Sequence, residues 1–254
     1  MKKMIAILAV AMLLWGASAS ADTLDFLKPF WMQMMDGVSN TASGKIPENV
    51  AVTCTDERLT VEAYGVLLEN DYSAEAHVYA VLKNTGSERL PIRSVQMTVL
   101  GANGNTLHQE NYVSYMPSVV EPGETMLVSE WMYDFVKEIG KVDSIQISVE
   151  TASRVNEKWK QLGDVRAWLD GDYLCVEFTN TTEKTLFGVI CAATVSDANG
   201  QILDMMMQSP YDTDDLGIAQ GSSIVWRKRL EDAATLKIGT DAVCKAWAYR
   251  MEDL

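Results

Sequence analysis

The sequence predicts an all-β protein of two tandem antiparallel β-sandwich domains, with a short helical segment ahead of them. Three observations support this prediction: apolar residues alternate with polar ones at the strand period of two, turn residues recur about every 8–12 residues, and one pattern occurs twice. Strands and helices do not alternate along the chain, as they would in a doubly wound fold. Short strands separated by frequent turns are typical of a sandwich.

The repeat has a period of nearly 100 residues. When 79–107 is laid over 175–203 without gaps, 9 of 29 positions are identical, against about two expected by chance. Beyond this block the offset grows from 96 to 98, which places Val120–Glu124 over Ile218–Ser222 and implies two extra residues in the second copy. The period is too long for a solenoid, so tandem domains are the better interpretation.

Each copy contains the same order of strand and turn signals. An alternating run, Val78–Lys83 or Leu174–Thr179, ends at an Asn-Thr turn. The next run carries Val95, Met97 and Val99 on one face and ends at an Asn-Gly pair, a strong hairpin signal because both residues tolerate positive φ. The remaining signals are the counterparts Cys191, Ala193 and Val195, the turns at Gly123 and Gly221, and the final strands Ser144–Val149 and Ala242–Tyr249.

The first residues have the pattern of a secretory signal peptide. Met1–Lys3 gives a positive start, Met4–Leu14 is apolar, and Ala19–Ala21 offers a small-residue cleavage site. A transmembrane anchor would need about 20 apolar residues, roughly twice this run. We therefore expect a signal that is cleaved and a soluble, exported mature protein that is extracellular, cell-surface associated or periplasmic and has no membrane span.

These signals divide the chain into segments. Asp22–Val38 is rich in Trp, Met and Leu and is typical of an amphipathic helix interrupted near Pro29, and the polar Ser39–Glu48 is expected to be a loop or tether. Arg154–Leu162 is expected to be a linker or a short helix. The predicted boundaries are a signal peptide over 1–21, a helical and linker segment over 22–50, a first sandwich over 51–152, a linker over 153–162 and a second sandwich over 163–254.

Turn motifs recur at Val81–Gly86, Ala102–Gly104 and Val120–Glu124 in the first copy, and at Val176–Asn180, Val195–Gly200 and Leu216–Gly221 in the second. Together they resemble a known family, the FxLYD-type domain of bacterial exported proteins. The second copy departs from the pattern at Thr182, where the first has Gly86. It departs again at Ala219-Gln220, where the first has Glu121-Pro122. The resemblance implies immunoglobulin-like sandwiches that act as non-enzymatic extracytoplasmic modules, with no catalytic residues to transfer.

The charge of the chain disfavours some classes of partner. The net charge is -14, with 35 acidic and 21 basic residues, and two more positive charges leave with the signal peptide. Such a chain repels phosphate backbones and anionic lipids, so we expect no nucleic-acid partner. The only concentrated basic patch, Arg227–Arg229, is expected to pair with nearby carboxylates.

No catalytic or metal-binding set stands out. The chain lacks a Gly-x-Ser-x-Gly motif, and its only histidines, His77 and His108, are expected at the surface. Asp212–Gly217 is superficially similar to a calcium loop but lacks EF-hand spacing, so a solvated acidic loop is favoured over a weak cation site. The carboxylates are too numerous for spacing to single out a glycosidase pair. We therefore expect no catalytic, cofactor-binding or metal-binding residues and no cofactor.

The four cysteines leave the disulfide pattern open. Cys54, Cys175, Cys191 and Cys244 allow three pairings and have no Cys-x-x-Cys spacing. Cys191 stands where the first copy has Val95, on the face expected to be buried, which favours a packed thiol. Strand alternation places Cys175 and Cys191 on opposite faces and argues against a bridge between them. Export permits disulfides without requiring them.

The tryptophans and methionines indicate packing or recognition. We expect the tryptophans to pack in cores or between domains, the alternative being a carbohydrate-stacking face. Met205–Met207 are expected to fill the edge of a core or interface, although methionine-rich surfaces also bind partners adaptively. The tryptophans concerned are Trp31, Trp131, Trp159, Trp168, Trp226 and Trp247.

The sequence therefore predicts an exported, non-enzymatic protein that binds or positions another molecule, an unknown protein or an envelope or extracellular glycan. Two alternatives stay open: a cell-envelope polysaccharide hydrolase with an unrecognised carboxylate site, and a purely structural spacer. The expected contact surfaces are edge strands and end loops, because loops on rigid scaffolds often carry recognition.

Overall fold

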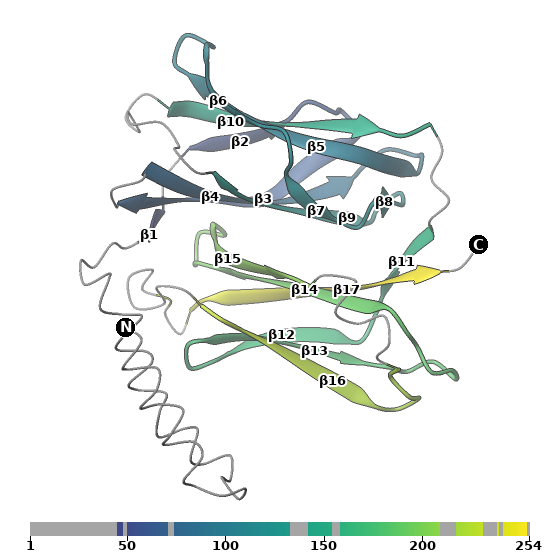
Figure 1. Ribbon diagram of the computed structural model, residues 1–254. Helices are drawn as coiled ribbons and strands as arrows, with labels where there is room; N and C mark the ends of the chain where they lie inside the picture. The colour runs from purple at the N-terminus through teal and green to yellow at the C-terminus, as the bar shows by residue number, and fades with distance from the viewer. Residues whose placement is uncertain are drawn as a thin grey trace, which may run out of the picture. The chain divides into compact units, whose positions relative to one another are not determined.

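The computed structural model describes residues 45–47, 50–70, 74–132, 142–153, 158–208, 217–230, 238 and 241–252. All of them lie in one compact unit, Ser43–Leu254. Every helix or strand assigned in this part of the chain is a strand, which confirms the all-β class (Figure 1). The predicted signal peptide over 1–21 and the predicted helix over Asp22–Val38 lie outside the described residues.

Two sheets form the first sheet pair. The β4 sheet contains, in spatial order, β1 (Lys45–Pro47), β3 (Leu59–Asn70), β4 (Ala74–Asn84), β9 (Thr125–Met132) and β7 (Ser114–Met116). The β5 sheet contains β2 (Ala51–Cys54), β10 (Val142–Thr151), β5 (Leu90–Gly101) and β6 (Thr106–Glu110), and β8 (Val119–Val120) pairs with the start of β5. All these pairings are antiparallel except that of β2 with β10, which is parallel.

Two further sheets form the second sheet pair. The β14 sheet contains β11 (Lys158–Leu162), β17 (Val243–Glu252), β14 (Val189–Ser196) and β15 (Ile202–Met207). The β13 sheet contains β12 (Val165–Asp170), β13 (Tyr173–Thr179) and β16 (Ser223–Arg229). The order β12-β13-β16 matches β3-β4-β9, and β17-β14-β15 matches β10-β5-β6.

Two segments differ from the prediction. Part of the expected linker or short helix, Lys158–Leu162, is strand β11, because it pairs antiparallel with β17. Part of the expected loop or tether, Lys45–Pro47, is strand β1, paired antiparallel with β3. Apolar and polar residues do not alternate clearly in either segment. Each segment becomes a strand because it pairs with the edge of an existing sheet.

The turn that follows β4 is built around Asn84, whose side chain is fully buried. Its amide nitrogen donates to the carbonyl oxygens of Glu88 at 2.8 Å and Val120 at 3.0 Å, and its amide oxygen accepts from the backbone N–H of Gly86 at 3.0 Å. The backbone of Asn84 exchanges two further hydrogen bonds with the 121–124 turn. One side chain thus satisfies buried backbone groups that the two turns leave without strand partners.

Asn180 does the same after β13. Its amide nitrogen donates to the carbonyls of Lys184 at 2.8 Å and Ile218 at 2.7 Å, and its amide oxygen accepts from the N–H of Thr182 at 3.0 Å. These partners stand at the offsets of 96 and 98 that the sequence repeat predicts. Thr182 keeps the hydrogen bond of its counterpart and adds one from its hydroxyl to the same amide oxygen, at 2.7 Å.

The two Asn-Gly hairpins also match each other. Gly104 and Gly200 have φ of 72° and 86°, whereas the preceding asparagines do not have positive φ. Gly104 N–H donates to the Gly101 carbonyl and Gly200 N–H to the Asp197 carbonyl, and a register shift follows in each ladder. Each hairpin is therefore a type I turn closed by a glycine bulge, which needs only one left-handed residue.

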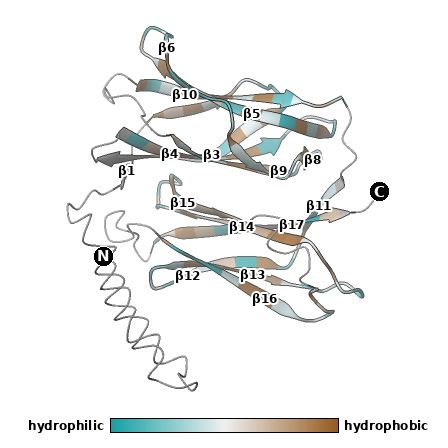
Figure 2. Ribbon diagram, in the orientation of Figure 1, coloured by the Kyte–Doolittle hydropathy of each residue, from teal (hydrophilic) through white to brown (hydrophobic). Residues whose placement is uncertain are grey.

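Apolar side chains fill three spaces between the four sheets. One core lies between the β4 and β5 sheets. A second, continuous cluster fills the space between the β13 and β14 sheets and extends to the outer face of the β4 sheet, including Leu67, Tyr79, Val81 and Leu127. In Figure 2, β14 and β17 are mainly white to brown, whereas β5 and β10 carry hydrophilic segments. The β4 and β14 sheets therefore pack through an apolar contact that is continuous with the core of the second sheet pair.

The backbones meet where β3 crosses β15. A Cβ built on the buried Gly65 would lie 1.8 Å from the Ile202 carbonyl oxygen. Tyr249 on β17 also donates its hydroxyl to the Thr125 carbonyl on β9, at 2.8 Å. Burial raises the pKa of Tyr249 well above its usual value, so the hydroxyl keeps the proton that it donates.

We expect Asn84→Ala to lower the free energy of unfolding by about 2–4 kcal/mol, because two buried carbonyls lose their donor. Urea denaturation followed by circular dichroism measures the change. Asn103→Ala, in an exposed hairpin, is the control and should change it by less than about 0.5 kcal/mol. Equal effects of the two changes would show that the buried amide is not a structural brace.

We expect Gly65→Ala to lower the free energy of unfolding by about 1–3 kcal/mol, because the new methyl group meets backbone, which cannot rotate away. Gly163→Ala is the matched control, since no atom lies within 4 Å of its built Cβ. Thermal unfolding of both variants tests the prediction, and a Gly65→Ala protein as stable as the control would contradict the close contact.

Candidate functional site

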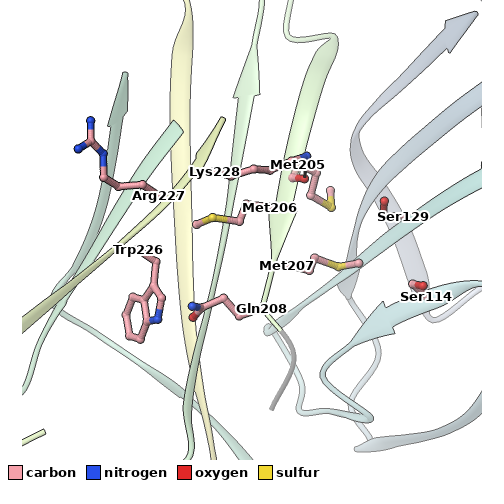
Figure 3. A pocket seen from close by; sticks show the side chains of 9 residues that line it. All are labelled: Ser114, Ser129, Met205, Met206, Met207, Gln208, Trp226, Arg227 and Lys228. Carbon is pink, nitrogen blue, oxygen red and sulfur yellow. Dashed lines mark hydrogen bonds between the residues drawn. The ribbon is translucent and has the colours of Figure 1, made fainter. Parts of the chain in front are cut away.

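A cavity of about 440 Å³ opens between the two sheet pairs (Figure 3). It lies where β15 and β16, the last strands of their sheets, approach β7 and β9 of the β4 sheet. Both sheet pairs therefore contribute to its wall, and the cavity depends on how they pack. Its lining residues are Ser114, Ser129, Met205, Met206, Met207, Gln208, Trp226, Arg227 and Lys228.

Strand alternation along β15 divides this lining into two sides, each of which combines apolar and polar groups. Figure 3 shows Met205 and Met207 pointing toward Ser114 and Ser129 of the first sheet pair. Met206 and Gln208 point to the other side of β15, toward Trp226 and Lys228. Thioethers and an indole thus lie beside hydroxyl, amide and ammonium groups, a mixture typical of a binding cavity.

An ion pair between a half-buried ammonium and a buried carboxylate forms one side of the cavity. Lys228 on β16 donates its ammonium to Asp204 Oδ1 at 2.6 Å and to the Met205 carbonyl at 2.9 Å. The Asp204 side chain is 5% exposed and that of Lys228 is 34% exposed. The ammonium has three donors, and the described residues accept two of its hydrogen bonds, so one donor is left for a ligand atom.

The ion pair also protects the edge of β15. Asp204 Oδ1 accepts from the Met205 N–H at 2.7 Å, and Lys228 binds the Met205 carbonyl, so both backbone groups are occupied by side chains. Charged groups placed on an edge strand in this way prevent pairing with another chain. Strand addition is therefore blocked at Met205.

A hydrogen-bonded chain links Asp204 to the first sheet pair. Tyr79 on β4 donates its hydroxyl to Asp204 Oδ1 at 3.3 Å, and His77 Nδ1 lies 3.2 Å from the Tyr79 oxygen. Because the only hydroxyl proton goes to the carboxylate, Nδ1 must carry the proton that joins His77 to Tyr79. The four side chains connect β4, β15 and β16 through polar contacts inside an otherwise apolar interface.

The expectation of two surface histidines is therefore wrong for His77, which is 7% exposed. Its ring lies against that of Trp131, with centroids 4.5 Å apart, and Trp131 Nε1 donates to Glu75 at 2.9 Å. An aromatic cover and a tyrosine hydroxyl make burial of this imidazole tolerable. His108, on β6, is half-buried.

The expected ion pairing of the basic patch is confirmed for two of its three residues. Arg227 bonds to Asp170 at 2.7 Å on the outer side of the β13 sheet, and Lys228 pairs with Asp204. The tryptophans divide between packing and partial exposure: Trp159 and Trp247 are buried, Trp226 lines the cavity, and Trp131 is 37% exposed. Met205 and Met206 are buried at the interface edge, as expected.

All four cysteines are free thiols. Cys191 is fully buried, as its position in the repeat predicts, and desolvation raises its pKa to about 12. Cys175 is buried as well, although it lies on the outer face of β13 between Trp168 and Arg227. A thiol with a pKa of about 12 stays protonated at neutral pH, so Cys191 is a packing residue rather than a nucleophile.

No group of three or more His, Cys, Asp or Glu side chains that could hold a metal ion occurs in the part of the chain that the structure describes. The predicted loop Asp212–Gly217 lies outside the described residues except for Gly217. The described residues also contain no helix long and apolar enough to cross a membrane.

Comparison with known proteins gives little. No protein-family model matches the chain, and no curated protein matches it. Among solved structures, red sea bream transglutaminase aligns over 89% of this chain and 31% of its own, at 12% identity and a TM-score of 0.20. The chain thus spans about a third of that protein. A TM-score this low supports no conclusion about fold or activity.

We expect Lys228→Met to lower the free energy of unfolding by about 3–5 kcal/mol, because it leaves the buried Asp204 carboxylate without its partner. Adding Asp204→Asn should restore part of the loss, and a double-mutant cycle from denaturant titrations measures the coupling. Lys83→Met, which breaks the exposed pair with Glu62, is the control and should cost less than about 1 kcal/mol. Additive effects of the Lys228 and Asp204 changes would contradict a coupled pair.

Proposed function

We propose that this chain is an exported, non-enzymatic binding protein, built from two immunoglobulin-like β-sandwich modules, which holds its ligand in the cavity between them. The observation that carries the proposal is the cavity of about 440 Å³ with mixed thioether, indole, hydroxyl and ammonium lining. The turn resemblance to FxLYD-type domains and the pattern of a signal peptide support export. The matching strand orders and the paired asparagines support two modules of one type.

The chemistry of the lining favours binding over turnover. Its nine residues include two serines but no carboxylate, imidazole or thiol, and its one amine, Lys228, is bonded to Asp204, which favours contacts over proton transfer. Asp204 lies behind this lining and its charge is already paired with Lys228. The ligand is accordingly expected to be uncharged where it meets Lys228, with a carbonyl or hydroxyl acceptor, and apolar where it meets the methionines.

Two alternatives make different predictions. A cell-envelope polysaccharide hydrolase needs two carboxylates about 5–9 Å apart on either side of a bound sugar, and the cavity lining supplies none. A structural spacer needs no cavity ligand at all. Cleavage of envelope polysaccharide would indicate the hydrolase, and retention of nothing would indicate the spacer. Retention of an unchanged species would indicate the binding protein.

The test is capture by the immobilised mature chain, residues 22–254, from native envelope and culture fractions, with bound proteins and glycans analysed separately. We expect saturable retention of one species. Ser129→Trp, which fills the cavity from the β9 side, should reduce retention at least about tenfold, because ligand and indole compete for one space. Ser148→Trp, on β10 of the β5 sheet, is the matched control and should leave retention unchanged.

Circular dichroism and melting temperature must first show that both variants are folded. Retention that is equal in the two variants would place the ligand outside the cavity. Retention of nothing above background would support the spacer, and release of shortened glycan would support the hydrolase.

A further inference from the structure

The outer face of the β13 sheet carries arginine and aromatic side chains in rows. Pairing across β12, β13 and β16 places Trp168, Cys175 and Arg227 in one row, with Arg166, Glu177 and Val225 on one side of it and Asp170, Tyr173 and Arg229 on the other. Burial along β16 alternates, and its outward residues are the exposed ones. The inner residues of the sheet, such as Val176 and Trp226, face the core.

Two of the arginines are held in place by their neighbours. The Arg166 guanidinium lies 5.2 Å from the Trp168 ring centroid and bonds to Glu177. The Arg227 guanidinium lies 4.6 Å from the Tyr173 ring centroid and bonds to Asp170. Their side chains are nevertheless 73% and 51% exposed, so most of the five donors of each remain directed at solvent. Ordering these side chains in advance lowers the entropy that a partner must overcome.

The corresponding face of the first sheet pair is already an interface. Tyr79 and Val81 on β4 lie in the apolar contact with the β14 sheet, and the repeat places Cys175 and Glu177 at the same positions on β13. Within the described residues, no sheet covers this face of β13. The outer face of β4 is therefore covered by the β14 sheet, whereas the equivalent outer face of β13 is not covered by a described sheet.

The charge of this face differs from that of the whole chain. Its outward residues include three arginines and two carboxylates, whereas the chain has 21 basic and 35 acidic residues. Tyr173 and Val225 add exposed apolar surface between the charged groups, at 38% and 47% exposure. Arginine, tyrosine and tryptophan together are the composition of interface hot spots between proteins.

We propose that this arginine-aromatic face docks the carboxylate-bearing surface of a second folded protein. A glycan fits less well, because the guanidiniums cover the ring faces on which sugars stack. Stacking on the open β5 face of a second copy also fits less well, because that face presents mainly hydroxyl and amide groups, such as Ser94, Gln96 and Thr98, rather than an excess of carboxylates. The face shares strand β16 with the cavity, and Arg227 borders both, but the face runs across β12, β13 and β16 whereas the cavity opens between β16, β15 and the β4 sheet.

The test uses a photo-crosslinking amino acid at Val225 in the full chain, expressed in cells that naturally produce it. Val243, on β17, is the matched control position, because the two valines are 47% and 48% exposed. Irradiation is expected to give one discrete protein adduct at 225 and none of that mass at 243. Mass spectrometry identifies the adduct, whose contact surface should be acidic.

Charge reversal tests the role of the arginines. Arg166→Glu together with Arg227→Glu should lower the adduct yield at least about tenfold, because like charges then face each other. Arg93→Glu is the control: its side chain is 69% exposed and paired with Glu150 on the β5 sheet, so the yield should not change. Melting temperatures verify that each variant is folded.

Four results would overturn the proposal. They are an adduct that survives the double charge reversal, an adduct that contains a second copy of this chain, an adduct that contains only glycan, and no adduct at 225 in cells where the chain is present and folded.

Discussion

Each sheet pair depends on a buried asparagine amide, Asn84 at the end of β4 and Asn180 directly after β13. Turns leave backbone groups without strand partners, and burying such groups unbonded costs about 1–3 kcal/mol each. Asn84 and Asn180 satisfy two carbonyls and one N–H apiece with a single side chain. Only an amide offers two donors and an acceptor in so small a volume. The turns on either side can then vary in length and sequence, as the two-residue insertion in the second copy shows.

The second constraint is that two sheet pairs with matching strand orders must meet through unlike faces. The outer face of the β4 sheet packs on the outer face of the β14 sheet, which is equivalent to the β5 sheet. A head-to-tail contact of this kind could continue indefinitely if both modules carried the same surfaces. The chain avoids this because its two open faces are polar or charged: Glu177 replaces Val81 at one end, and Ser94 and Gln96 stand in place of Ile190 and Ala192 at the other.

The positions of many strands along the chain could be predicted because they depend on local signals. Alternation placed the strands, and Asn84, Asn180, Gly104 and Gly200 are visible as identities between the copies. Strands β1 and β11 could not be predicted, because their geometry comes from the sheet edges they join.

The candidate site was harder to predict. Met205–Met207 and Arg227–Arg229 drew attention in the sequence, but Asp204 did not, because its role depends on Lys228 and Tyr79, which are distant along the chain. His77 was expected at the surface because Trp131, which covers it, is 54 residues away. The sequence nevertheless contained a signal for the contact between the sheet pairs. On one face of equivalent strands, the residues are apolar in one copy and polar in the other.

The close approach of Gly65 to Ile202 has a consequence for how this protein can diverge. The atoms in contact are the Gly65 Cα region and the Ile202 carbonyl oxygen, so the contact involves no side chain on either strand. Among descendants of this chain, position 65 is expected to stay glycine while position 202 drifts among apolar residues. Methods that infer proximity from correlated substitution detect pairs that change together, and this pair offers one partner that cannot change. This close backbone contact between the two sheet pairs would therefore leave no covariation to detect.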